Sequence, residues 1–124
     1  MNEKEDKKTL VVGGSTKPER YSNKAIRKLL KYGYQVVSIG LREGDVEGVK
    51  IQTGFPVLKG IHTVTMYIGP QNQPQYYDYI LNLKPSRIIF NPGTENPEFE
   101  EMANKKGIET VNDCNLIMLY KGLF

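Results

Sequence analysis

Short apolar runs that alternate with helical patterns constrain the fold of this chain more than any other feature. Five runs suit buried strands: Leu10–Val12, Val36–Ile39, Val64–Ile68, Arg87–Phe90 and Glu109–Val111. The segments between them predict helices, one from an N-cap at Ser22 to a stop at Gly33 and two more over Pro74–Leu83 and Pro97–Lys106. This alternation implies right-handed crossovers and helices on both faces of a sheet. It predicts an α/β fold, a three-layer Rossmann-like domain with a five-stranded, mostly parallel sheet.

One segment, from Arg42 to Gly60, breaks this rhythm because it is rich in glycine and lacks apolar periodicity. We expect an excursion with a short extra strand near Val49–Ile51 rather than a linker between domains. A chain of 124 residues suits one compact domain. We therefore predict a charged tail over residues 1–8 and a single domain over residues 9–124.

The overall charge and apolar content limit the partners. A formal net charge of +3 is mild, and no strongly basic stripe or reading motif is present, so we expect no nucleic-acid partner. No apolar run approaches the roughly 20 residues of a membrane span, and the charged first residues do not suit a signal peptide. The single cysteine, Cys114, agrees with a reducing compartment. These features predict a cytoplasmic protein that binds an anionic small molecule and no membrane.

The loop between the first strand and the first helix has the character of a phosphate-binding loop. Two glycines, Gly13 and Gly14, are followed by Ser15, Thr16 and Lys17. Backbone N–H groups converge at the start of a helix, and the helix dipole adds roughly half a positive charge there. However, a dinucleotide fingerprint would need glycine at positions 15 and 18, and no Walker pattern is present. The loop suits a phosphate but belongs to neither standard type.

The residue that follows the second strand indicates which kind of nucleotide this loop suits. NAD-binding domains place an acidic residue there to hold the ribose 2′-OH, whereas this chain has Arg42. A guanidinium cannot accept hydrogen bonds from a diol but can form a bidentate contact with a phosphate. This favours NADP or coenzyme A (CoA), both of which carry a ribose phosphate. The alternative is that Arg42 forms a surface ion pair with Glu43 or Asp45.

The sequence VVGGSTKPERYS at positions 11–22, together with a second strand that ends near Arg42, resembles the small stand-alone CoA-binding proteins. These proteins are similar to the N-terminal CoA-binding domain of the succinyl-CoA synthetase α subunit. The resemblance covers residues 9–119 and is most specific over Gly13–Arg20. It implies a Rossmann-like domain that binds CoA or an acyl-CoA.

The resemblance also implies a role for each loop. The pyrophosphate would lie on Gly13–Lys17 and the following helix, with Arg42 at the 3′-phosphate of the adenosine. The loops around Ile68–Gln71 and Asn91–Thr94 would line the path of the adenine and pantetheine. The predicted binding residues are Gly13, Gly14, Ser15, Thr16, Lys17, Arg20, Ser22, Arg42, Ile68, Gly69, Asn91, Pro92, Gly93 and Thr94.

No arrangement of residues in the sequence indicates catalysis. There is no spacing typical of metal ligands, no nucleophile elbow and no acid pair. The only histidine, His62, precedes the third strand, so we expect it at the surface of the amino edge, away from the ligand. Glu95 is the one carboxylate expected on the binding edge, and it has no partner base. In the succinyl-CoA synthetases that this sequence resembles, the catalytic phosphohistidine lies in a separate domain that follows the CoA-binding domain.

We therefore predict a non-catalytic CoA-binding module without a metal, which acts on a protein partner or forms a homodimer. One alternative is an NADP-binding module or small oxidoreductase. The other is an interaction domain whose pocket is vestigial.

Three features leave further alternatives open. Cys114 is either a small core residue or a thiol near the thiol end of bound CoA. Four cations share one helix face that we expect to be solvated, with the first of them best placed near a bound phosphate: Lys24, Arg27, Lys28 and Lys31. Some of the tyrosines at positions 76, 77 and 79 are expected to be partly exposed, where they stack on the ligand, contact a second copy or pack half-buried on the core.

Overall fold

The computed structural model describes residues 6–124, so residues 1–5 of the predicted tail lie outside the described residues. Its strands are β1 (Thr9–Val12), β2 (Val36–Ile39), β3 (Gly44–Val46), β4 (Val49–Gln52), β5 (Thr63–Met66), β6 (Arg87–Phe90) and β7 (Glu109–Asn112). Its helices are α1 (Tyr21–Lys31), α2 (Tyr77–Leu83), α3 (Pro97–Lys105) and α4 (Asn115–Tyr120), with short 3-10 helices η1 (Pro70–Asn72) and η2 (Pro74–Tyr76). Strands and helices alternate as the sequence predicts.

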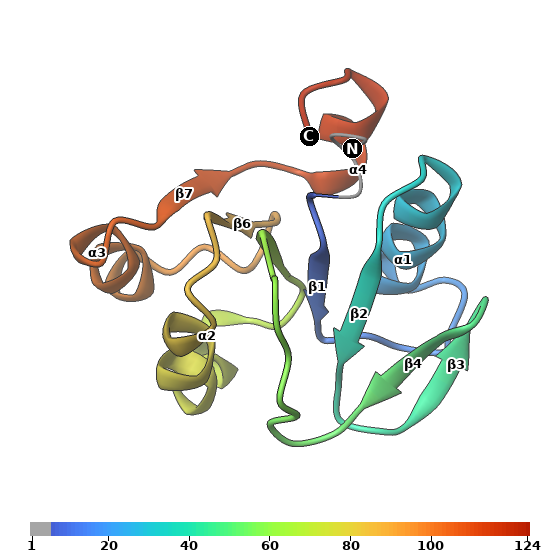
Figure 1. The fold of residues 1–124 in the computed structure, drawn as a ribbon, viewed down its shortest axis with the longest axis horizontal. Coiled ribbons are helices and arrows are strands. Elements are labelled where there is room, and N and C mark those ends of the chain that lie inside the picture. The colour runs from blue at the N-terminus through green and yellow to red at the C-terminus, as the bar shows by residue number, and fades with distance from the viewer. Residues whose placement is uncertain (1–5) are drawn as a thin grey trace.

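All described strands join one sheet in the order β3-β4-β2-β1-β5-β6-β7, and every pair is parallel except β3 with β4 (Figure 1). The Rossmann-like α/β class is confirmed, but the prediction of five strands is wrong, because the sheet has seven. The segment after Arg42 forms a hairpin that turns at Glu47 and Gly48, both with positive φ. The extra strand near Val49–Ile51 is confirmed. Its partner β3 escaped prediction because only one of its three residues is buried.

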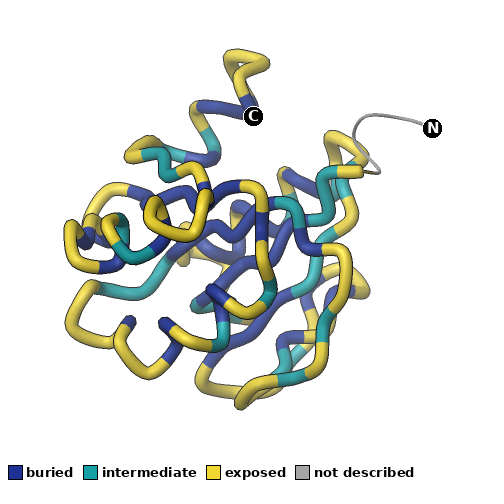
Figure 2. Tube along the Cα trace, turned by 60° about the vertical axis from the view of Figure 1, so that its left-hand side comes forward, coloured by how far each residue is buried: buried dark blue, intermediate teal, exposed yellow. Residues whose placement is uncertain are grey.

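Alternate residues of each central strand point to opposite faces of the sheet, and each face is covered by its own helices. On β1, Leu10 and Val12 pack in one core with residues of α2 and α3, whereas Val11 packs in the other core with Ile26 of α1 and Met118 of α4. Figure 2 shows the buried strands between more exposed outer segments. The three predicted layers follow from this double-sided burial.

Two helix predictions need correction, and one helix was not predicted. α1 begins at Tyr21 with Arg20 as its N-cap, so Ser22 is not the cap. The N–H of Arg20 donates to the Lys17 carbonyl (3.1 Å), and this turn leads into the helix two residues earlier than predicted. The segment predicted as one helix over Pro74–Leu83 divides into η2 and α2. α4 was not predicted, because its six residues are too short a window for apolar periodicity.

The three neighbouring tyrosines, at positions 76, 77 and 79, pack against the core of the protein. Tyr76 and Tyr77 are buried, and the Tyr77 ring stacks on Phe99 with centroids 4.5 Å apart. Tyr79 is half-buried, and its hydroxyl donates to the Pro56 carbonyl at 2.6 Å. Burial raises the pKa of both Tyr77 and Tyr79. These rings stabilise the α2 side of the fold and do not line the cavity described next.

Candidate functional site

A cavity of about 940 Å³ lies where the loops at the carboxyl ends of the parallel strands meet. This is the edge at which open α/β sheets bind ligands, and the volume suits a small organic molecule. Most of the predicted binding residues line it: Gly13, Gly14, Ser15, Thr16, Lys17, Arg20, Ser22, Arg42, Ile68, Asn91, Pro92 and Thr94. Residues that follow four different strands are thus brought together.

The two glycines after β1 are required by close backbone packing. The N–H groups of Gly13 and Gly14 both donate to the Ile39 carbonyl, at 2.9 and 3.0 Å. Gly13 has a φ of +97°, and a Cβ there would lie 2.8 Å from Cγ2 of Ile68. A Cβ on Gly14 would collide with the hydroxyl of Ser38. Glycine therefore lets the loop pass between β2 and the end of β5 before it reaches the cavity.

Side chains of α1 hold the rest of this loop in place. Asn23 Nδ2 donates to the Ser15 carbonyl (2.8 Å), and its Oδ1 accepts a hydrogen bond from Arg27 Nε (2.8 Å). Arg27 also donates from Nη2 to the Pro18 carbonyl at 3.3 Å. Arg27 was expected on a solvated helix face, but it is half-buried and braces the loop. Periodicity cannot reveal such a contact, because it depends on how the loop folds back over the helix.

The start of α1 presents unused donors to the cavity. Its N-cap residue, Arg20, forms no side-chain capping hydrogen bond, and no acidic residue lies in the first turn. Tyr21 and Ser22, the first two residues of the helix, line the cavity together with the exposed cations Lys17 and Arg20. Because N–H groups at a helix start carry a partial positive charge, this wall of the cavity favours an anion.

Arg42 lies on the same cavity, beyond the end of β2. Its side chain is exposed, and no ion pair with Glu43 or Asp45 is found among residues 6–124. Asp45 instead accepts a hydrogen bond from the Gly48 N–H at 2.9 Å. The surface ion pair that was the alternative for Arg42 is therefore not formed, and the guanidinium is free to contact a ligand.

The predicted residues after β5 and β6 divide into lining and structural positions. Asn91 reaches the cavity wall, yet its Nδ2 donates to Thr65 Oγ1 and the Met66 carbonyl, and its Oδ1 accepts from the Asn115 N–H. Its polar atoms therefore join β5, β6 and α4. Gly69 and Gly93 do not line the cavity. Gly69 is the N-cap of η1, and Gly93 lies at an exposed turn where its N–H donates to Glu95 Oε1 at 2.8 Å.

Several lining residues were not among the predicted set: Tyr21, Leu41, Glu43, Tyr67, Cys114, Leu116 and Ile117. Leu116 and Ile117 belong to α4, so a correct prediction of that helix would have indicated them. The Tyr67 hydroxyl is buried without a hydrogen-bond partner in the described part of the chain, and burial raises its pKa. Cys114 is half-buried at the N-cap of α4, so its thiol is a wall residue rather than a core residue.

His62 lies at the opposite edge of the sheet, directly before β5, as predicted. It is half-buried, and its Nδ1 is 2.7 Å from Thr63 Oγ1. Burial, followed by the nearby charge of Arg87, lowers the pKa of His62. Within residues 6–124 no group of three or more His, Cys, Asp or Glu side chains is placed to hold a metal ion. None of the helices described is long and apolar enough to cross a membrane.

The sheet order, the helix layers and the cavity at the carboxyl edge define a Rossmann-like α/β domain. A family model described as a CoA binding domain matches residues 7–120. The chain therefore belongs to the CoA-binding domain family, and the resemblance found in the sequence is confirmed.

Solved structures share this fold. The crystal structure of an uncharacterized protein is 47% identical, with a TM-score of 0.93 over 95% of this chain and 98% of that chain. A hypothetical protein from Pyrococcus horikoshii OT3 is 27% identical, with a TM-score of 0.84 over 94% of this chain and 83% of that one. An acetyl-coenzyme A synthetase from Ca. Korarchaeum cryptofilum, at 18% identity, shares the fold (TM-score 0.72) over 89% of this chain and 26% of its own. A search of curated proteins gave no significant match.

Proposed function

We propose that this chain binds CoA or an acyl-CoA in the cavity at the carboxyl edge and leaves the ligand chemically unchanged. Membership of the CoA-binding domain family supports the choice of ligand. The observation that carries the proposal is the uncapped start of α1 at the cavity wall, beside Lys17 and Arg20. Unused N–H groups, a helix dipole and two cations at one place suit the pyrophosphate of CoA.

We assign Arg42 to the 3′-phosphate at the adenosine end. Its exposed guanidinium on the cavity wall supports this role, because a bidentate contact with phosphate needs both N–H edges unoccupied. Ile68, Pro92 and Thr94 lie farther along the lining and suit the pantetheine arm. The thiol end would then lie toward Cys114.

The lining supports binding rather than catalysis. Its one carboxylate is Glu43, and no histidine is among the described lining residues, so an acid–base pair is not assembled there. The single cysteine in the chain also supports a reducing compartment, which we propose to be the cytoplasm.

Thermal unfolding with CoA, dephospho-CoA and NADP, run in parallel, tests the proposal. CoA at 100 times its Kd is expected to raise the free energy of unfolding by about 2.7 kcal/mol. Mass spectrometry should recover the CoA unchanged. Absence of any shift at millimolar CoA would overturn the proposal, and a shift with NADP alone would replace it with the NADP-binding alternative.

The Arg42→Gln variant tests the assignment of the 3′-phosphate. Unaltered protein should bind CoA about tenfold more tightly than dephospho-CoA, because a charge-assisted bidentate contact is lost with the phosphate. The variant should bind both ligands equally. Lys50→Gln is the matched control, since Lys50 is an exposed cation on β4 outside the cavity lining. If Arg42→Gln and Lys50→Gln preferred CoA over dephospho-CoA to the same extent, the assignment of Arg42 to the 3′-phosphate would be wrong.

A further inference from the structure

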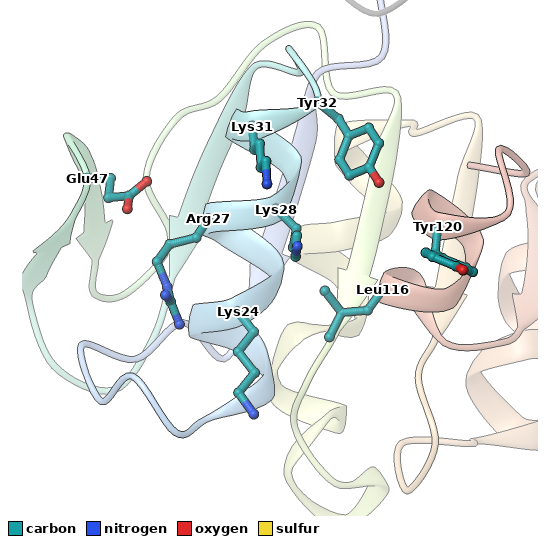
Figure 3. Close-up of a pocket in the computed structure, with 8 residues that line it drawn as sticks. All are labelled: Lys24, Arg27, Lys28, Lys31, Tyr32, Glu47, Leu116 and Tyr120. Atoms are coloured by element: carbon teal, nitrogen blue, oxygen red, sulfur yellow. The ribbon is translucent and has the colours of Figure 1, made fainter.

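A second cavity, of about 520 Å³, lies along the outer face of α1 and is bordered by α4 (Figure 3). Lys24, Lys28 and Lys31 line it from α1, and Leu116 and Tyr120 line it from α4. Leu116 also lines the cavity at the carboxyl edge, so the two cavities adjoin. We call this second cavity the α1–α4 groove. The proposed function does not use it.

The three lysines form a regular row that has no carboxylate partner in the described part of the chain, although the Lys24 ammonium lies over the Tyr21 ring, 5.0 Å from its centroid. They occupy positions i, i+4 and i+7 of α1 and therefore follow one helix face over about 10 Å. All three are exposed, and within residues 6–124 no carboxylate lies within 4.0 Å of their ammonium groups. The one carboxylate that lines the groove is Glu47, at the tip of the β3–β4 hairpin. Like charges at this spacing destabilise an isolated helix, so the row suits an acidic partner better than solvent.

The α4 side of the groove offers apolar contacts instead of charge. Leu116 and Tyr120 stand one helical turn apart, and Tyr120 is 85% exposed. Two further apolar side chains of this C-terminal segment are exposed outside the groove lining, Ile117 at 49% and Leu123 at 63%. Exposed aromatic side chains such as Tyr120 are enriched at protein interfaces, where they serve as anchors. A nucleic-acid backbone would satisfy the lysines but not these side chains, and the chain's net charge is only +3.

We propose that the α1–α4 groove binds an acidic amphipathic helix of a partner protein. Carboxylates at helical spacing on that helix pair with Lys24, Lys28 and Lys31, and its apolar stripe packs on Leu116 and Tyr120. The partner is thereby held next to the cavity at the carboxyl edge. This inference rests on the groove alone and does not require CoA to be the ligand of that cavity.

A fluorescein-labelled synthetic peptide provides the probe. It carries Glu at positions that repeat the i, i+4, i+7 spacing and Leu along the adjacent stripe, and a second peptide has the same residues in an order without amphipathic character. Fluorescence anisotropy should show that the amphipathic peptide binds at least about tenfold more tightly than the reordered one. Equal binding of both peptides, or binding of neither, would overturn the proposal.

Two sets of neutralising variants separate a specific groove from general charge attraction. Lys24→Gln, Lys28→Gln and Lys31→Gln combined should weaken peptide binding about tenfold. The matched control combines Lys50→Gln, Lys59→Gln and Lys106→Gln, which removes the same charge from exposed lysines outside the groove and should cost less than about twofold. A third variant, Tyr120→Ala, should weaken binding at unchanged charge. Equal losses in the groove and control sets would overturn the proposal.

Other occupants are tested on the same variants. Polyuridylate or phosphatidylcholine–phosphatidylserine vesicles that bind more tightly than the peptide, with loss in the groove set alone, would replace the helix with a nucleic acid or a membrane. The CoA shift in thermal unfolding is measured on the Tyr120→Ala variant, because Tyr120 lines the groove and not the cavity at the carboxyl edge. It should be retained, so that failure of the groove and failure of the proposed CoA site are distinguishable.

Discussion

At the amino edge of the sheet, polar side chains are bonded to one another, whereas at the carboxyl edge cations extend into an open cavity. Thr63 Oγ1 accepts a hydrogen bond from Arg87 Nε at 2.8 Å and lies 2.7 Å from His62 Nδ1. The Arg87 guanidinium also covers the Phe124 ring, 4.4 Å from its centroid. By contrast, Lys17, Arg20 and Arg42 are exposed on the cavity wall. The polar side chains of the amino edge hold the fold, whereas these three cations of the carboxyl edge are exposed to a ligand.

The carboxyl edge nevertheless has rigid parts, and the difference lies in which atoms are fixed. Backbone contacts at Gly13 and Gly14 and the side chains of Asn23 and Arg27 hold the loop after β1. The cations that reach the cavity are not used in that scaffold. Such an arrangement prepares donors for an anion before it arrives, which reduces the cost of ordering them on binding.

Of the substitutions at the carboxyl edge, Gly14→Ala is expected to change stability and CoA affinity the most. The new methyl group would collide with the Ser38 hydroxyl, so the loop must shift away from β2. We expect a loss of about 1–3 kcal/mol in the free energy of unfolding, as for other overpacked sites, and at least a tenfold loss in CoA affinity. Chemical denaturation and isothermal titration calorimetry measure the two quantities.

A second substitution shows whether the collision itself is the cause. Ser38→Ala removes the colliding oxygen together with its hydrogen bond to the Val11 carbonyl. Combined with Gly14→Ala, it should restore most of the lost CoA affinity relative to Ser38→Ala alone. If the single Gly14→Ala variant bound CoA as tightly as the unaltered protein, the close contact between Gly14 and Ser38 would not be needed to position the loop.

A smaller effect is expected from Arg27→Ala, which removes the brace from the loop but leaves its backbone intact. Two hydrogen bonds are lost, one to Asn23 Oδ1 and one to the Pro18 carbonyl. CoA affinity should fall by about fivefold, while the free energy of unfolding falls by about 1 kcal/mol. Lys28→Ala is the matched control, because it removes the same charge from the same helix without touching the loop. Equal losses of affinity would show that charge, not bracing, is responsible.

The sequence predicted well those parts of the molecule whose neighbours along the chain determine their structure. β1, α1 and β2 follow from local apolar periodicity, and the positive φ of Gly33 after α1 agrees with the predicted helix stop. The glycine loop and Arg42 were predicted to share one site, because the carboxyl ends of parallel strands lie at the same edge of the sheet. Both line the same cavity.

The features that escaped prediction depend on contacts between distant segments. β3 is a short edge strand that exists through its pairing with β4, and its sequence Gly-Asp-Val carries no strand pattern. The brace at Arg27 depends on the loop folding back over α1. Asn91, a polar loop residue predicted to bind a ligand, lines the cavity, but the three structural hydrogen bonds of its amide were not indicated by the sequence. Residue type alone cannot distinguish these two uses of an asparagine.

The smallest expected effect concerns the amino edge and follows from the pKa of His62. Burial and the charge of Arg87 lower this pKa below the usual value of 6.5. The unfolded chain therefore binds the proton at higher pH than the folded protein does. The stability associated with neutral His62 is fully present above about pH 6.5 and is lost as the pH falls through the lower pKa of the folded state.

His62→Gln should remove this part of the pH dependence. Between about pH 7.5 and pH 5, the unaltered protein should lose more stability than the variant, as measured by chemical denaturation at each pH. Because the chain has one histidine, its ring proton resonances report the folded pKa directly in an NMR titration. A folded pKa above 6.5, or a variant that loses more stability in acid, would contradict the prediction. CoA affinity should respond equally to pH in both proteins, because His62 lies at the edge opposite the cavity.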